Sequence, residues 1–412
     1  MRPRLNTIWL ALITLAGLFS LAFLWFTLFP GEISSEARLY FSIDQITQGR
    51  EYNQAIQMIF IGSFLAEALF LIWFIFGSQG MHLNTLTRYL TGSNYWGNIL
   101  KFFLSMWLAL RIINLPFALY GGYFLQHRWG FSTENMASWW MDYFKGAGLD
   151  LILSATGALL LFWIMRRWKT SWWLAGAAFI SIWIVIQTLI WPVMVSPIFN
   201  HFSPATDPKI VNMVHHLSEK AGLPVGQVLV MDASRRTTKA NAYFTGIGPT
   251  KRIVLYDTLL SNYPLDQVEA VVAHEMAHWH QGHLFKGLSL GIVGSFFVWG
   301  FVFLLLKKTV KTSTSQPPPH IWAIILLIFL LISFVGGPVE NYISRGMEKE
   351  ADQIAVSLTG DIPAIINLQT NLAARNLSEV SPPAFIQWFS YSNPPALIRI
   401  KNIIRATNPN QN

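Results

Sequence analysis

Seven long apolar runs constrain this chain more than any other feature. A bilayer-spanning helix needs about 20 mostly apolar residues, and seven runs qualify: Ile8–Phe29, Ala55–Phe76, Ile99–Phe124, Leu149–Met165, Trp172–Val195, Leu284–Leu306 and Ile321–Val335. Only 12% of the 412 residues are charged, against about a quarter in an ordinary soluble domain. The sequence therefore excludes a soluble globule and a disordered chain. It predicts an α-helical polytopic membrane protein with seven transmembrane helices.

The charges of the chain gather near the ends of these runs. A formal net charge of +8 would suggest nucleic acid as the partner of a soluble chain. Here Lys and Arg lie where lipid headgroups meet the spans, so we expect the lipid bilayer and no nucleic acid. The chain has no Cys, which excludes disulfides, thiolate metal ligands and cysteine nucleophiles.

Two stretches are too polar to lie in a membrane. The first, residues 199–283, has turn signals at Ser203-Pro204 and Gly248-Pro249. We expect a small β-sheet there, with short strands at Gln227–Met231 and Ile253–Tyr256 and a third candidate at Ala240–Phe244. The second is the tail from about residue 338, where the amphipathic piece Ile398–Ile404 favours a helix packed on the protein.

A metal-binding pattern lies at the end of the first polar stretch, where residues 274–278 read HEMAH. Residues i and i+4 share one face of a helix, so His274 and His278 can present their imidazoles to one metal ion. Glu275 projects beside that face and can accept a proton from water. The pattern predicts a metallopeptidase helix.

A hydrolytic zinc site needs a third protein ligand and an open position. The other histidines of this region are poor candidates. His280 and His283 do not share the face of His274 and His278 and are expected at ordinary interfaces, and His215 and His216 lie in a polar, helix-like stretch. A carboxylate is therefore the better candidate.

The segment Asn341–Asp352 reads NYISRGMEKEAD and offers such a carboxylate. Glu348 and Asp352 are four residues apart on a predicted helix, so one can bind the metal while the other orients a ligand imidazole. Between the HEMAH helix and Glu348 the chain crosses the membrane twice. Both segments therefore end on the same side and can meet.

These motifs resemble the type 1 CAAX prenyl proteases, which are seven-helix membrane zinc metallopeptidases. The resemblance rests on HEMAHW, the paired span that follows it, and NYISRGMEKEAD. It also covers Leu115–Lys145, similar to the family segment between the third and fourth spans, and Ser234–Leu260, similar to the strand pair ahead of the catalytic helix. The resemblance predicts a large water-filled chamber enclosed by the helices.

The resemblance also implies roles for individual residues. Glu348 would be the third ligand of one Zn²⁺ per chain, with Glu275 as the general base and Asp352 and Asn341 close around the metal. Arg345 or Asn393 would stabilise the oxyanion. The edge strand that pairs with the backbone of a peptide or protein substrate would comprise Ala240, Asn241, Ala242, Tyr243 and Phe244. No oligomer is required for this arrangement.

One departure from the family concerns the substrate. The family has Ser-His-Pro near the C-terminus, whereas this chain has Ser392, Asn393 and Pro394. An Asn can donate a hydrogen bond but carries no positive charge, and it is also a favoured N-cap.

The predicted function is a zinc metalloendopeptidase that resembles a CAAX prenyl protease. The alternatives are a quality-control peptidase without prenylated substrates and, from another class, a transporter or receptor with a fortuitous HExxH.

Polar and charged residues lie within the predicted spans, among them Glu67, Arg111, Asn114 and Asp150. Ionisable groups at that depth usually face a cavity or a partner. For Arg111 the alternative is a side chain that reaches the membrane–water interface from a helix end.

The spans and the two polar stretches divide the chain into four parts. These are 1–198 with helices one to five, 199–283 with HExxH, 284–337 with helices six and seven, and 338–412 with the third ligand.

Two indications of membrane orientation disagree. The family resemblance places the zinc site in the cytoplasm. The short loops on the opposite side hold nine basic residues, and those on the catalytic side hold four, which by the positive-inside rule favours the reverse. The nine are Arg2, Arg4, Arg88, Arg166, Arg167, Lys169, Lys307, Lys308 and Lys311; the four are Arg38, Arg50, Arg128 and Lys145.

Overall fold

The computed structural model describes residues 5–77, 79–92, 94–246, 251–310 and 316–407. Within these ranges, seven helices are long and apolar enough to cross a membrane, which confirms the seven predicted spans. Two of them contain a π-helical turn. The spans are α1 (Thr7–Leu28), α2 (Ile43–Phe76), α4 (Tyr95–Leu119) continuing through Tyr120–Phe124 into α5 (Leu125–Arg128), α6 (Met136–Arg167), α7 (Trp172–Ile190) continuing through Trp191–Val195 into α8 (Ser196–Phe199), α12 (His283–Thr309) and α13 (Ile321–Thr359).

Local sequence signals set the ends of several helices. The side chain of Asn6 accepts hydrogen bonds from the first turn of α1, as a polar N-cap does. Ser42 and Gln45 form a reciprocal capping box at the start of α2. At the other end of the chain, Gly360 adopts a φ of 69° and ends α13, a conformation that favours glycine.

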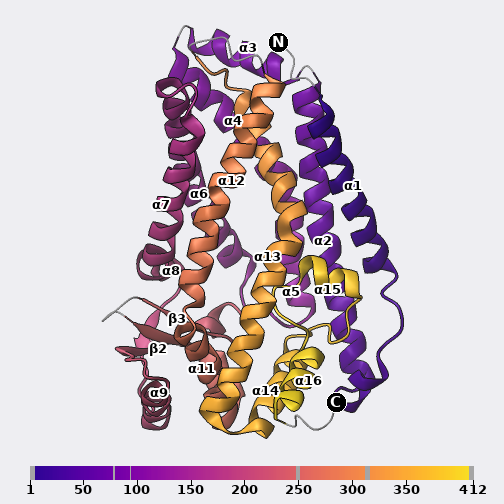
Figure 1. The fold of residues 1–412 in the computed structure, drawn as a ribbon, viewed down its shortest axis with the longest axis vertical. Helices are drawn as coiled ribbons and strands as arrows, with labels where there is room; N and C mark the ends of the chain where they lie inside the picture. Colours follow the sequence, from indigo (N-terminus) through magenta and orange to yellow (C-terminus); the bar gives the residue numbers. More distant parts are fainter. Residues whose placement is uncertain (1–4, 78, 93, 247–250, 311–315, 408–412) are drawn as a thin grey trace.

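The remaining elements lie mainly at one end of the helix bundle, which we call the sheet end (Figure 1). They include the strands β2 and β3 and the helices α9, α11, α14 and α16, whereas α3 lies at the opposite end. Their bounds are α3 (Gln79–Thr91), α9 (Pro208–Ala221), α10 (Asp257–Asn262), α11 (Leu265–His280), α14 (Ile362–Arg375), α15 (Ala384–Ser390) and α16 (Ala396–Thr407).

Four short strands form a mixed sheet with the order β1-β2-β4-β3. They are β1 (Phe202–Pro204), β2 (Gln227–Met231), β3 (Ala242–Thr245) and β4 (Arg252–Tyr256). β2 and β4 are parallel, and β3 pairs with β4 antiparallel at the edge of the sheet. The turn expected at Ser203-Pro204 is wrong, because both residues pair with β2. Proline is compatible with a strand at a sheet edge. The turn expected at Gly248-Pro249 falls outside the described residues.

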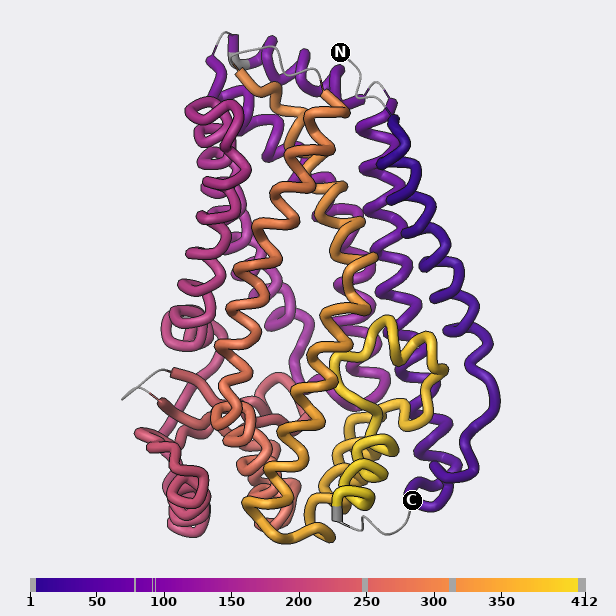
Figure 2. The backbone as a smooth tube through the Cα atoms, in the orientation of Figure 1, coloured from indigo at the N-terminus to yellow at the C-terminus, as the bar shows by residue number. Residues whose placement is uncertain are grey.

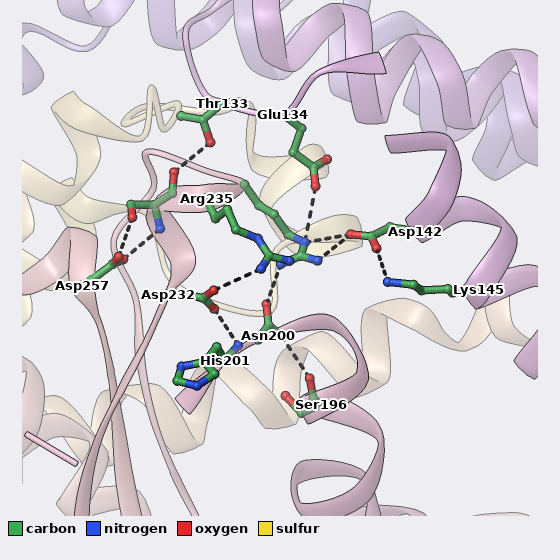
Figure 3. Close-up of polar contacts among 12 residues, drawn as sticks. Thr133, Glu134, Asp142, Lys145, Ser196, Asn200, His201, Asp232, Arg235 and Asp257 are labelled. Carbon is green, nitrogen blue, oxygen red and sulfur yellow. Dashed lines mark hydrogen bonds and ion pairs between the residues drawn. The ribbon is translucent and has the colours of Figure 1, made fainter. Parts of the chain in front are cut away.

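The sheet is joined to the membrane helices by a cluster of polar contacts, in which the Arg236 guanidinium is bonded to Asp142 of α6 and paired with Glu134. Figure 3 labels these two acidic residues. Thr133 donates to the carbonyl of Ser234, and Ser132 forms a β-bridge with Thr237. These contacts link the loop before α6 to the segment that leads into β3. The position of the edge strand is therefore tied to the membrane helices.

The polar residues of the spans find partners inside the bundle. Arg111 of α4 forms an ion pair with Asp150 of α6, and Asn114 donates to Glu67 of α2 at 3.1 Å. Arg111, Asn114 and Asp150 also line a cavity of about 240 Å³ between α4, α6 and α13. Arg111 thus faces a partner and a cavity, and the alternative of a side chain reaching for the interface is wrong.

α13 is a single helix of 39 residues that runs from the far end of the bundle into the sheet end (Figure 2). An aromatic cluster fixes it against its neighbours. The ring of Phe334 stacks on Phe64 of α2 with centroids 3.7 Å apart and contacts Phe389 of α15 at 4.9 Å. Stacked and tilted aromatic pairs stabilise packing beyond the area that they bury. The last span and the segment NYISRGMEKEAD therefore form one continuous element.

Candidate active site

Two helices from different parts of the sequence bring three potential metal ligands together. α11 carries His274 and His278 one turn apart, and α13 presents Glu348 to them. The Nε2 atom of His274 lies 3.3 Å from Glu348 Oε2, and that of His278 lies 3.3 Å from Glu348 Oε1; the two Nε2 atoms are 3.1 Å apart. Because all three ligand atoms lie within 4.8 Å of each other, these residues could hold one metal ion.

The chemistry of this donor set fits zinc. Two imidazole nitrogens and one carboxylate are the protein ligands of hydrolytic zinc sites, which keep a further position open for water or substrate. The three side chains line a cavity of about 570 Å³ at the sheet end of the bundle. This cavity provides space for water or substrate at the open coordination position.

Asp352 and Arg399 lie directly behind His274. The Nδ1 atom of His274 is 3.1 Å from Asp352 Oδ1, and the Arg399 guanidinium donates to both oxygens of Asp352. Burial lowers the pKa of His274, but its hydrogen bonds with Asp352 and Glu348 outweigh that effect and raise the pKa to about 9. The surroundings of His274 therefore favour a positive charge at this position.

Glu275 lines the same cavity as its two histidine neighbours. Burial raises the pKa of its carboxyl group, although the nearby imidazoles of His274 and His278 oppose this shift. A carboxylate with a raised pKa is a stronger base than one in water. The residue is thus suited to accept a proton from a water molecule in the cavity.

The predicted substrate strand borders the cavity with one part of its length. Ala240, Asn241 and Ala242 line the cavity, and Ala242 begins the edge strand β3. Phe244 instead packs on Trp279 of α11 with ring centroids 5.1 Å apart. Tyr243 and Phe244 are not among the lining residues. The ring contact holds the edge strand against the helix that carries the histidines.

Asn393 also lines the cavity, beside the first turn of α16. The helix begins at Ala396, and the carbonyl of Pro395 accepts its first backbone hydrogen bonds. An N-cap residue directly precedes its helix, so Asn393 lies two residues too early for that role. Its side chain is available for contact with a substrate.

Arg345 and Asn341 are both bonded to backbone carbonyls of the segment that contains α15. The Arg345 guanidinium donates to the carbonyls of Gln387 and Tyr391, and the Asn341 amide donates to the carbonyl of Phe389. Neither residue is among those that line the cavity. Both side chains therefore hold α15 and the loop after it against α13.

Sequence reasoning missed two neighbours of the ligands. Arg399 lies in the predicted amphipathic helix, but no spacing rule connects it to Asp352, which is 47 residues away. His283 was expected at an ordinary interface, which is wrong, because its ring contacts that of His278. The helical-face argument failed because α11 ends at His280, and Gly282, with a φ of 63°, turns the chain before α12.

His280, His215 and His216 are not among the residues that line the cavity. His280 contacts the carbonyl of Ala221 at the end of α9, which agrees with an ordinary interface histidine. His215 and His216 are exposed on α9.

Two family models together match most of the chain. The model described as CAAX prenyl protease N-terminal, five membrane helices, matches residues 30–201, and that of peptidase family M48 matches residues 204–407. The chain belongs to the CAAX prenyl protease family of M48 peptidases. It is an integral multi-pass membrane protein and a metalloendopeptidase of this type, with a metal that is generally zinc in the family. This result is incompatible with the transporter or receptor alternative.

Individual relatives agree with this assignment. The uncharacterized metalloprotease YhfN of Bacillus subtilis is 29% identical over 307 residues, which are 73% of this chain and 72% of the relative. The CAAX prenyl protease 1 of Saccharomyces cerevisiae is 28% identical over 69% of this chain and 67% of its own length. The crystal structure of S. mikatae Ste24p matches with a TM-score of 0.83 at 21% identity, covering 98% of this chain and 100% of that structure. The last comparison confirms the fold.

Proposed function

We propose that this chain is a zinc-dependent membrane endopeptidase that hydrolyses peptide segments admitted to the cavity at the sheet end of the bundle. His274, His278 and Glu348 would bind one zinc ion, and a single chain would suffice. The observation that carries the proposal is the convergence of three ligand atoms within 4.8 Å, at a cavity that Glu275 also lines. The zinc content and the turnover of the Glu275→Gln and Glu348→Ala proteins test the proposal.

When bound, zinc supplies Lewis acidity, which acidifies water and polarises a carbonyl group. The residues of the chain would transfer the proton, orient the ligands and align the substrate. Glu275 would accept the proton of the attacking water and deliver it to the leaving amine. Asp352 would hold the His274 ring by its Nδ1 atom, so that Nε2 faces the metal. Ala240, Asn241 and Ala242 would align the substrate as an added strand.

The oxyanion that forms during peptide hydrolysis needs a hydrogen-bond donor. We assign this role to the amide of Asn393, which lines the cavity. Arg345 is the weaker candidate, because its guanidinium is bound to two backbone carbonyls.

The substrate class follows from the charges around the cavity. Removal of a C-terminal tripeptide would place a terminal carboxylate about 10 Å from the scissile bond, at roughly 3.3 Å per extended residue. Among the described residues that line the cavity, Arg399 is the only basic one apart from histidine, and it is bonded to Asp352. The cavity thus offers little to a terminal carboxylate. We propose that internal peptide segments are substrates and that a prenyl group is not required.

Matched peptides test this substrate class. We expect a farnesylated peptide, its plain counterpart and a plain peptide with a blocked C-terminus to be cleaved with kcat/KM values within about 10-fold of one another, which is about 1.4 kcal/mol. Cleavage can be followed by mass spectrometry with purified protein in lipid vesicles. Cleavage of the farnesylated peptide alone would contradict the proposal and restore the prenylated tripeptide as the substrate.

Asn393 provides a second prediction for this site. Asn393→His should raise kcat by about 5- to 10-fold with little change in KM, because a charge-assisted hydrogen bond is roughly twice as strong as a neutral one and acts mainly in the transition state. The measurement is kcat and KM on the best peptide substrate. Asn393→Asp, which cannot donate from a carboxylate, should lower kcat. An equal kcat in all three proteins would remove Asn393 from the reaction.

A further inference from the structure

We propose that His283 and Glu350 form a relay that orients His278 as a metal ligand. This inference rests on the proposed function, because it assigns a positioning role to residues that stand behind the zinc site. Neither residue belongs to the ligand set, and neither is among those that line the cavity.

The contacts of the relay run in a line from the ligand to the surface. The Nδ1 atom of His283 lies 2.9 Å from the Nδ1 atom of His278, and the Nε2 atom of His283 lies 3.1 Å from Glu350 Oε2. His283 is 5% exposed, whereas half of the Glu350 side chain is exposed beside Lys286, 3.4 Å away. One end of the relay is thus buried and the other reaches solvent.

The positions of the protons follow from these contacts. A histidine that binds a metal through Nε2 carries its proton on Nδ1, so His278 must donate toward His283. The Nδ1 atom of His283 then has to accept, which places the proton of that ring on Nε2. From there it can be donated to the Glu350 carboxylate, which only accepts. Glu350 therefore selects the tautomer of His283, and His283 selects that of His278.

The two ligand histidines are supported in different ways. His274 donates to Asp352 directly, and Asp352 is 4% exposed and bonded to Arg399. The Nε2 atom of His278 faces Glu348, and its Nδ1 atom is connected to the Glu350 carboxylate through the His283 ring. Because water can replace a half-exposed Glu350 as the acceptor but cannot reach the buried His283 ring, the relay should depend more on His283 than on Glu350.

The test measures zinc affinity, by competition with a chelator of known affinity, on the purified full-length protein. His283→Phe removes the acceptor for His278 and should weaken zinc binding by about 10- to 100-fold, the usual effect of losing such support. His283→Gln supplies an amide oxygen and should remain within about 3-fold of the wild type. Glu350→Ala should weaken binding less than His283→Phe does. Saturating zinc should restore most of the kcat of the Phe variant.

His280→Phe is the matched control, because His280 contacts the end of α9 and not the ligands. Its zinc affinity should equal that of the wild type. The melting temperature of each zinc-free protein reports on folding. If His283→Phe does not fold, the zinc affinities of His283→Gln and Glu350→Ala are compared with that of the wild type to test the relay. Wild-type affinity in both His283→Phe and Glu350→Ala would overturn the relay alone. A wild-type protein without zinc affinity would overturn the proposed function, and the relay with it.

Discussion

Glu275→Gln should retain nearly normal zinc content and lose turnover by about 100-fold or more, the scale of a lost general base. The substitution keeps the size of the side chain and most of its hydrogen bonding. The amide cannot accept a proton from water, so binding and chemistry are separated. The measurements are zinc content of the purified protein and kcat on a peptide substrate.

Glu269→Gln provides the control for this experiment. Glu269 lies on the same helix, six residues before Glu275, and is not among the cavity-lining residues. Its substitution should change neither zinc content nor kcat by more than about 2-fold, because the partly exposed Glu269 does not line the cavity. A Glu275→Gln protein that cleaves peptides at the wild-type rate would show that another group is the base.

Glu348→Ala should lower both the zinc content of the purified protein and its activity. Removing the carboxylate leaves two protein ligands, whereas hydrolytic zinc sites have three. We expect turnover below about 1% of the wild type at limiting zinc, since the reaction depends on the metal as Lewis acid. Removal of the metal from the wild type with a chelator should have the same effect and be reversed by added zinc.

Glu340→Ala is the control on the same helix. Glu340 is exposed on α13, eight residues before Glu348. Its replacement should leave zinc content unchanged, so that a general disturbance of α13 can be told from loss of a ligand. Full zinc occupancy in the Glu348→Ala protein would exclude Glu348 as the third ligand.

The parts of the site that were predictable obey a fixed spacing on one helix. His274 and His278, like Glu348 and Asp352, are pairs four residues apart, and a helix sets their relative direction before any tertiary contact forms. The seven spans were predictable for a similar reason. In a bilayer, the hydrogen bonds of the backbone must be formed within the helix, so the length and hydropathy of a segment largely decide whether it spans the membrane.

The parts that were missed depend on how separate elements meet. Arg399 reaches Asp352 because α16 packs on α13, a contact that no local pattern contains. Arg345 is predicted near the metal from its place in the motif, and its guanidinium donates to the carbonyls of another segment, which the sequence gives no sign of. Proximity in sequence to a ligand says on which helix a residue lies, but not which face of the helix it occupies.

α13 runs without interruption from the far end of the bundle to Glu348, with Pro338 inside it. From Ile321 to Glu348 the helix spans 27 steps, which is about 40 Å at 1.5 Å per residue. Treated as a rod pivoting at Ile321, it would move the Glu348 carboxylate by about 0.7 Å for each degree of tilt, more than the roughly 0.5 Å that a working site tolerates. The stack of Phe334 on Phe64 and the bonds of Arg345 thus act as angular bracing. Because tilting is one way in which a helix accommodates a change of bilayer thickness, this bracing would keep the Glu348 carboxylate in place when the bilayer changes.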